Sequence, residues 1–556
     1  MSLVPVTGRN FIPYKGSYIP RAVVRFIQKY WTQVSTQIEY RQEGGSWQPI
    51  EGYARMIPDV DMVVHTVVLD GLNADTIYEY RVSGDAEKIA TYLCLKPNGN
   101  AASSMVIHWV TPTPRNDNGY PSPGTNATVY KFRTVPDSLS TRNLNLGEIS
   151  DYNKNGSLVT SETRFPDVYE RLGMNNENMD AMMFMGDFGD EDSDPDKIFY
   201  WEDFFVEHNK RMIKSDGRVI PYIPCVGNHE VAGGFYKQIY KYASRILGDS
   251  FIFNSFFSEF RNYAFFDLGD DVTVIVMDAM HTTGTNNIIA ASATKWLFDT
   301  LEEKKNKKHI IYGQHAGIFN TVYSNTFPMH RNMRNVWYPE LSKVGAINLL
   351  FHGHDHSFSI SKPIHYLEVS VDVAVSSIEV KCENHGIDNG AAAGWRATTP
   401  PTGLSDTIND TEPHYYIHVI DTNTLTLHSS EPEAILGDNP ISFSDNGDGI
   451  QAIHVIHEDG IVNCGGGGAS DFRPVWNPNT TFYLDINALE SNQYKTAQSG
   501  VVDSLDGQQA YEGDDDIVSL TNRLGHFFLI EVSQTQIEAK AINILGDELG
   551  RVTREI

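Results

Sequence analysis

The sequence predicts an α/β protein in which β-rich segments flank a central domain of alternating strands and helices. Residues 21–136 carry strand signals almost throughout, residues 140–360 alternate apolar strand-like segments with helical stretches, and strand signals return beyond residue 360. Residues 1–20 form a short N-terminal arm. With 556 residues, 41% of them hydrophobic, the chain is long enough for about two to four domains with full-sized cores.

Residues 21–136 are predicted to form a β-sandwich. The segments with strand composition are residues 34–50, as a hairpin around Gly44-Gly45, and residues 63–69, 76–82, 105–110 and 129–135. Leu72 lies in a turn ahead of the tyrosine-rich segment 76–82. A leucine that anchors a turn before such a strand resembles the fibronectin type III domain.

Residues 140–360 carry the candidate functional site. Five apolar segments there end in side chains that bind metals: Asp151 and Asn153 follow residues 146–149, Asp187 follows 181–185, Asn228 and His229 follow 221–226, His315 follows 309–314, and His354 and His356 follow 350–352. The carboxyl ends of parallel strands meet at one edge of an α/β sheet, where such folds place their ligands. Carboxylate, carboxamide and imidazole groups together suit Zn, Fe or Mn better than Ca or Mg. The sequence therefore predicts a metal site.

Helices are expected between these strands. Residues 294–303 place apolar side chains at helical spacing ahead of the strand that ends at His315, and residues 335–343 do the same ahead of the strand that ends at His354. Strands that alternate with helices predict a parallel sheet.

The order and identity of the strand-end motifs resemble the calcineurin-like metallophosphoesterase superfamily. Its ordered signature is Asp-x-His or Asp-x-Gly, Gly-Asp, Gly-Asn-His-Asp/Glu, a lone His, and Gly-His-x-His. The β-sandwich ahead of the motifs narrows the resemblance to the purple acid phosphatase-like branch. The resemblance implies a four-layer α/β/β/α catalytic domain over residues 140–360, a β-rich insertion at 361–450, and a C-terminal return at 451–556 that completes the catalytic domain.

The resemblance also implies a binuclear centre of divalent or mixed-valence Fe, Zn or Mn, and it assigns roles to the motif residues. Asp187 matches the carboxylate that bridges both ions, Asp151 and His356 match ligands of the first ion, Asn228, His315 and His354 match ligands of the second, and His229 matches a histidine that faces the substrate without binding metal. Two such ions can hold a phosphate and lower the pKa of a bridging water, whose hydroxide then attacks phosphorus. A charged imidazole at His229 is the natural proton donor to the leaving oxygen.

The chain departs from the family pattern at three places. Asn153 stands where relatives have His or Gly, and it could add an oxygen ligand; an alternative register would put Glu148 at the ligand position in place of Asp151. Asp190 replaces the tyrosine of the purple branch, so we expect no tyrosine-to-iron charge-transfer colour. Ala316 follows His315, although the family usually has a proline close after this histidine.

Three further residues are candidates for substrate binding. His281 follows the apolar strand at residues 272–278, from which it could reach the substrate. Arg331 and Arg334 are suited by chemistry, because a guanidinium can grip two phosphate oxygens. The alternatives are a solvated loop histidine and a solvated helix face.

The charge balance favours a small substrate. The chain has 43 basic and 71 acidic residues, for a net charge of −28, and such a surface repels nucleic acid and anionic membranes.

No apolar run approaches the length of about 18 residues that a membrane helix needs. The first residues lack the basic and apolar regions of a signal peptide, although the family resemblance indicates a secreted or periplasmic protein. The four cysteines form no Cys-x-x-Cys pair, which argues against a zinc-finger site.

Two functions remain open from the sequence. The first is a metal-dependent phosphoric ester hydrolase, similar to acid phosphatases, that acts on phosphomonoesters or small phosphodiesters. The second is a phosphoesterase fold retained as a binding or adhesion module with weak or no activity.

Overall fold

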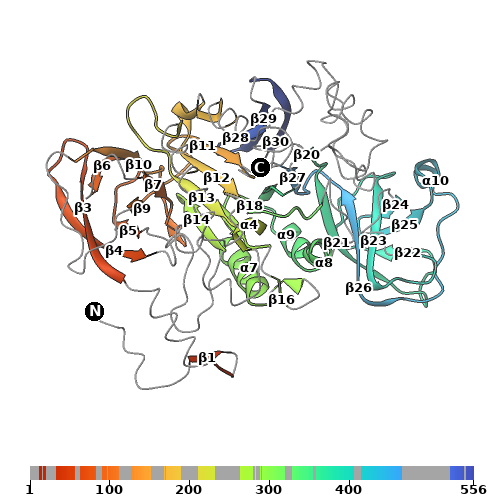
Figure 1. The fold of residues 1–556 in the computed structure, drawn as a ribbon. Helices are drawn as coiled ribbons and strands as arrows, with labels where there is room; N and C mark the ends of the chain where they lie inside the picture. The colour runs from red at the N-terminus through yellow and green to blue at the C-terminus, as the bar shows by residue number, and fades with distance from the viewer. Residues whose placement is uncertain are drawn as a thin grey trace, which may run out of the picture.

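The computed structural model describes most of the chain, in the ranges 12–14, 17–19, 33–56, 63–82, 90–96, 98–111, 127–151, 168, 171–173, 175–188, 204, 211–231, 263–279, 282–283, 288–289, 291–319, 328–354, 359–405, 415–465, 526–543 and 546–555. Within these ranges the structure is mostly β, with several sheets and few helices (Figure 1). The predicted α/β class is therefore confirmed in part, because strands dominate over helices. None of the helices in these ranges is both long and apolar enough to cross a membrane.

The N-terminal strands form one antiparallel ladder, at the left of Figure 1. In spatial order they are β10 (Tyr130–Arg133), β6 (Ile77–Val82), β3 (Gln33–Gln42), β4 (Gln48–Met56), β5 (Val63–Asp70), β9 (Ser104–Thr111) and β7 (Ala90–Cys94). The expected sandwich differs from the structure in one respect. Cys94 of β7 pairs with Tyr222 of the next domain, so the ladder continues into a thirteen-stranded sheet.

The remainder of this sheet carries three of the strand-end motifs. After β7 come β13 (Tyr222–Cys225), β12 (Ala181–Met185), β11 (Leu144–Ile149), β28 (His526–Val532), β29 (Gln536–Asn543) and β30 (Glu548–Glu555). The strands β11, β12 and β13 are parallel to one another, and β28 to β30 are antiparallel neighbours. The carboxyl ends of β11, β12 and β13 therefore share one edge.

A second, seven-stranded sheet carries the other two motifs. Its order is β20 (Ser359–Ile360), β27 (Val462–Gly465), β19 (Ile347–His352), β18 (His309–Gln314), β15 (Val272–Met277), β14 (Ala264–Leu268) and β8 (Gly99–Asn100). The four strands from β27 to β15 are parallel. One hydrophobic core joins the two sheets, since Met183 of the first clusters with Val274, Ile311 and Leu349 of the second.

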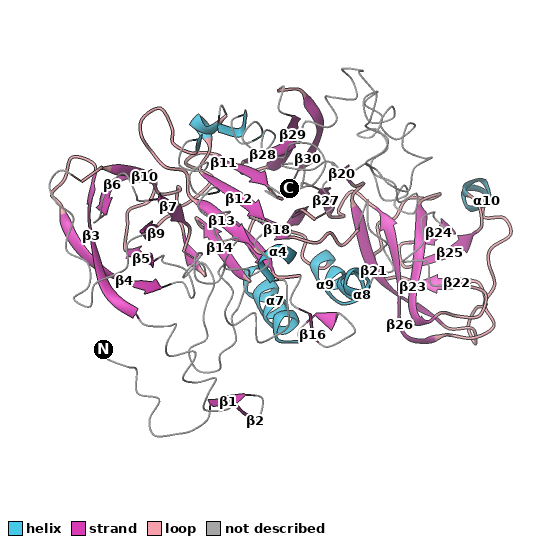
Figure 2. Ribbon diagram, viewed as in Figure 1, coloured by secondary structure: helices cyan, strands magenta, loops and turns pink. Residues whose placement is uncertain are grey.

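Helices cover the outer face of the seven-stranded sheet (Figure 2). They are α7 (Ala291–Lys304), α8 (Pro328–Asn332), a π-helix at Met333–Trp337, and α9 (Tyr338–Ser342). Both helical predictions are confirmed. In α7, Ala293, Leu297 and Leu301 recur at a spacing of four and are buried. The segments between β11, β12 and β13, which would supply the other helical layer, lie largely outside the described residues.

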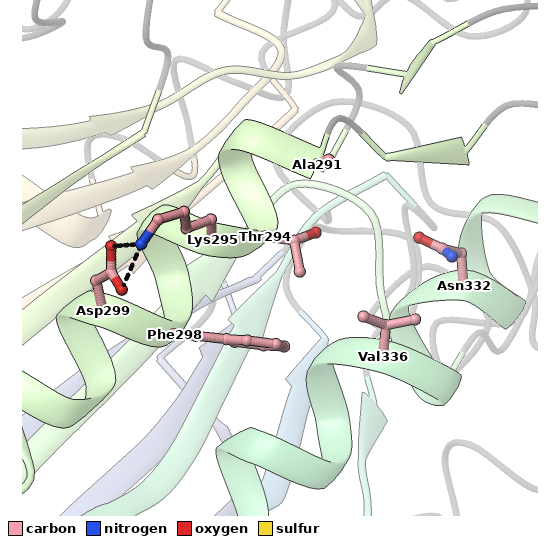
Figure 3. Close-up of a pocket in the computed structure, with 7 residues that line it drawn as sticks. All are labelled: Ala291, Thr294, Lys295, Phe298, Asp299, Asn332 and Val336. Carbon is pink, nitrogen blue, oxygen red and sulfur yellow. Dashed lines mark hydrogen bonds and ion pairs between the residues drawn. The ribbon is translucent and has the colours of Figure 1, made fainter. Parts of the chain in front are cut away.

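A groove of about 470 Å³ separates α7 from the π-helix (Figure 3). Phe298 of α7 and Val336 of the π-helix line it, and Lys295 forms an ion pair with Asp299 at its rim. This groove lies on the outer helical layer.

The C-terminal strands β21 to β26 close into a barrel, at the right of Figure 1. The strands are β21 (Ile364–Val371), β22 (Glu379–Lys381), β23 (Ala392–Thr399), β24 (Tyr415–Asp421), β25 (Thr424–His428) and β26 (Asp448–Ile456), with the short helix α10 (Glu431–Leu436) between the last two. The barrel has its own core around Trp395 and Ile417. The domain boundaries proposed from the sequence stay predictions.

Glu148 is a buried carboxyl group in the core between the two sheets. It pairs with Met183 on one side and Phe528 on the other, and both of these side chains belong to the shared core. Neither oxygen of Glu148 has a hydrogen-bond partner among the described residues. Burial, and then the charge of Asp151, raise the pKa of Glu148 well above its usual value, so the side chain is held in its neutral form.

Replacing Glu148 by Met should stabilise the protein at alkaline pH. The unfolded chain loses the Glu148 proton above about pH 4.5, the ordinary pKa of glutamate, whereas the folded chain keeps it. The stability of the parent should therefore fall as pH rises above this value, by about 1.4 kcal/mol per pH unit from this one group. Thermal unfolding midpoints from pH 5 to 8 test this. Glu148→Gln, which is polar but cannot ionise, should also lose the pH dependence; a parent-like slope in both variants would contradict the assignment.

Candidate metal centre

Three of the strand-end residues adopt left-handed backbone conformations. Their φ angles are 60° at Asp151, 57° at Asp187 and 69° at His354. Residues other than glycine rarely adopt this conformation, and such residues cluster at functional sites when the surrounding structure enforces them. Here the turns direct side chains from β11, β12 and β19 into one region.

Asp187 is held by its neighbours at the ends of β12 and β13. The carboxylate of Glu230, in the short helix α4 (Asn228–Val231), accepts the N–H of Asp187 at 2.9 Å, of Phe188 at 2.8 Å and of Gly227 at 2.6 Å. Asp187 Oδ1 in turn accepts the N–H of His229 at 3.1 Å. These contacts fix the Asp187 turn against the turn that carries Asn228.

Four of the residues predicted to bind metal converge beside this turn. His315 Nε2 lies 3.2 Å from Asp187 Oδ2, and Asn228 Oδ1 lies 3.1 Å from His315 Nε2 and 2.8 Å from His354 Nδ1. The ligand atoms of Asp187, His315 and His354 all lie within 4.8 Å of one another. His315 Nδ1 donates to the carbonyl of Met185 at 2.7 Å, which turns Nε2 toward the cluster. One carboxylate, one carboxamide and two imidazoles form a donor set that fits a transition metal.

Asp151 lies next to this cluster. It is fully buried, and its carboxylate accepts the backbone N–H of His354 at 3.1 and 3.2 Å. Glu148, the alternative ligand, lies in the core between the sheets, so the placement favours Asp151. Asn153 and His356, the other residues predicted to hold the first ion, lie outside the described residues.

The charges of the cluster favour a cation. Although burial alone raises the pKa of Asp187, the imidazoles of His315 and His229 hold that pKa well below its usual value. Burial lowers the pKa of His315, but Asp187 outweighs it and raises the pKa to about 9. The pKa of Glu230 is raised to about 7 by burial and by the charge of Asp187. The centre thus gathers carboxylates that a positive ion would stabilise.

Two glycines allow the turns to approach this closely. A Cβ atom on Gly227 would lie 2.0 Å from Asp187 Oδ1, and one on Gly353 would lie 2.5 Å from Asp151 Oδ2. Both distances are far below contact distance, so neither position can carry a side chain without displacing a carboxylate.

His229 lies at the exposed side of the cluster. Its Nε2 is 3.8 Å from Asp187 Oδ2, and 24% of its side chain is exposed, against 1% for Asp187. A partly exposed imidazole beside a buried metal site can reach a bound substrate.

The structure supports the predicted phosphate-binding residues less well than the predicted metal ligands. Arg334 is fully buried, and its Nη1 donates to the carbonyl of Ile318 at 2.7 Å, so it is no solvated phosphate-binding group. The sequence left two interpretations open for Arg334, a phosphate contact and a solvated helix face, whereas in the structure its side chain is buried. His281 and the side chain of Arg331 lie outside the described part of the chain.

Sequence reasoning assigned no role to Glu230, although it is the last residue of the Gly-Asn-His-Glu motif. Its hydrogen bonds to three backbone N–H groups make it the residue that holds the Asp187 turn. The motif could have indicated this role. A buried acidic side chain next to two candidate site residues needs hydrogen-bond partners.

One comparison with known protein families covers the region of the motifs. Residues 149–358 match the family described as calcineurin-like phosphoesterase. The structure is similar to that of purple acid phosphatase PPD1 from yellow lupin (Lupinus luteus) seeds, at 10% sequence identity and a TM-score of 0.44, over 98% of this chain and 95% of the other. It is also similar to the structure of PhoD, at 11% identity and a TM-score of 0.45, over 94% of this chain and 85% of that one. No curated protein matches the sequence.

Asp187→Asn should abolish metal binding at the centre. It removes the charge of the carboxylate that lies beside the imidazoles of both His315 and His229. Elemental analysis of the purified variant should fall from about two ions per chain to nearly none. Asp299→Asn, at the rim of the groove in Figure 3, is the control and should keep the parental content. Full metal content in Asp187→Asn would contradict the assignment.

The same elemental analysis of Asp151→Ala and Glu148→Ala decides which of these two carboxylates is the metal ligand.

Zinc affinity should rise with pH between 7 and 9. In the metal-free protein the raised pKa of His315, about 9, means that a proton occupies the imidazole and zinc must displace it. Affinity should therefore increase by about tenfold per pH unit up to about pH 9 and then level off. Competition with a chelator at several pH values measures this. An affinity that is flat from pH 7 to 9 would show that His315 is already neutral, as an ordinary histidine is.

Proposed function

We propose that this chain, whose residues 149–358 match the calcineurin-like phosphoesterase family, is a binuclear metal-dependent hydrolase of phosphomonoesters or small phosphodiesters. The observation that carries the proposal is the convergence of Asp187, Asn228, His315 and His354 on one point, with His229 beside them. These residues follow strands of two sheets, and two of them, Asp187 and His315, are buried.

The centre would hold two ions of Fe, Zn or Mn. Asp187, Asn228, His315 and His354 would bind one of them, and Asp187 and Asp151, together with His356 and Asn153, would bind the other. When bound, such ions neutralise the charge of a phosphate and lower the pKa of water.

The protein's own residues would orient the ester and move a proton. His229 would donate the proton from its imidazole to the leaving oxygen, since it is partly exposed and its backbone N–H is fixed by Asp187. The net charge of −28 supports a small ester over a long polyanion.

His229→Ala should slow turnover while metal content stays at the parental level. General acid catalysis is typically worth about 10²–10⁴ in rate, and the loss should be largest for alkyl phosphates, whose leaving groups need the proton most. Initial rates on a series of mono- and diesters, with elemental analysis of each preparation, measure both quantities.

Two outcomes of this series would count against the proposal. If His229→Ala hydrolyses alkyl phosphates as fast as the parent, His229 is not the acid. If the metal-loaded parent hydrolyses no ester in the series, the fold serves as a binding module instead.

A further inference from the structure

The loop that follows His315 is held at four successive carbonyl groups. Residues 315–319 are buried and have no regular secondary structure, so their backbone groups need other partners. His315 O accepts the N–H of Gly353. The next three carbonyls each accept from a side chain, namely Ala316 O from Gln314 Nε2, Gly317 O from His330 Nδ1, and Ile318 O from Arg334 Nη1.

Two of these donors come from the helical layer. His330 lies in α8 and Arg334 in the π-helix; they are 2% and 0% exposed, and each donates at 2.7 Å. The π-helix is also anchored to α7, where Trp337 Nε1 donates to Thr294 Oγ1 at 3.0 Å. Thr294 lines the groove in Figure 3. Short π-helical segments are rare and occur frequently at functional sites.

The opposite side of the loop packs on the turn that carries His354. A Cβ atom on Gly317 would lie 2.9 Å from the ring of His352, and His352 directly precedes Gly353 and His354. The loop therefore lies between the helices and the second histidine of the cluster. A displacement of the loop would move His315 relative to His354.

We propose that Arg334 and His330 are positioning residues of the metal centre, which hold the 315–319 loop so that the imidazole of His315 stays within reach of Asp187 and Asn228. The inference rests on the proposed function only in that the centre binds metal. Residues that orient metal ligands from outside typically contribute 10-fold to 100-fold to metal affinity. The sequence suggested Arg334 as a phosphate contact. It acts on the site instead through its hydrogen bond to the backbone of the 315–319 loop.

Zinc titration of the metal-free protein tests the proposal without any activity measurement. Arg334→Met keeps the length of the side chain and removes the donor; it should weaken one of the two zinc-binding steps by roughly 10-fold to 100-fold. His330→Phe removes the bond to Gly317 and should weaken the same step. The matched control is Thr294→Val, which removes the hydrogen bond between the same π-helix and α7 and should leave both steps unchanged.

A double-mutant cycle separates positioning from general destabilisation. If Arg334 acts through His315, then Arg334→Met should cause no further loss of zinc affinity in a His315→Ala background. Additive losses in the cycle, parental affinity in folded Arg334→Met and His330→Phe, or an equal loss in Thr294→Val would each overturn the proposal. If Arg334→Met does not fold, His330→Phe and its own cycle with His315→Ala decide. A parent that binds zinc but hydrolyses no ester would refute the proposed function and leave this test intact.

Discussion

The buried carboxylate of Glu230 fixes the turn that carries Asp187, and the geometry of the whole centre depends on this contact. It accepts three backbone N–H groups from the ends of β12 and β13. Hydrogen bonds to an ionised acceptor are about twice as strong as neutral ones, which offsets part of the cost of burying Glu230 beside Asp187. Because Asp187 then accepts the N–H of His229, the bridging candidate and the proposed proton donor are placed by one network.

The two-sheet architecture explains why ligands from distant parts of the sequence meet. Asp151, Asp187 and Asn228 follow parallel strands of the thirteen-stranded sheet, while His315 and His354 follow parallel strands of the seven-stranded sheet. The sheets share one core, so the positions of their strand ends are coupled through close packing. A rigid core of this kind can hold ligand groups in place before a metal binds.

Several conformational costs fall at or near this centre. Left-handed backbone at Asp151, Asp187 and His354 opposes folding, and so does the buried carboxyl of Glu148, which has no hydrogen-bond partner among the described residues. Local features that disfavour folding are expected where function requires them. The hydrogen bonds that hold the 315–319 loop and the Asp187 turn favour folding, because they stabilise the folded conformation of each turn.

The sequence alone determined which residues stand at the strand ends and that parallel strands would bring them together, because strand periodicity and the chemistry of carboxylate, carboxamide and imidazole groups are local properties. Asp187, Asn228, His315 and His354 were identified in this way, and the structure places them side by side. Tertiary structure alone decided the inward orientation of Arg334, the core position of Glu148, and the pairing of β7 with β13 that merges the N-terminal strands into the thirteen-stranded sheet. These features depend on contacts between residues far apart in the chain, which no local pattern of residues specifies.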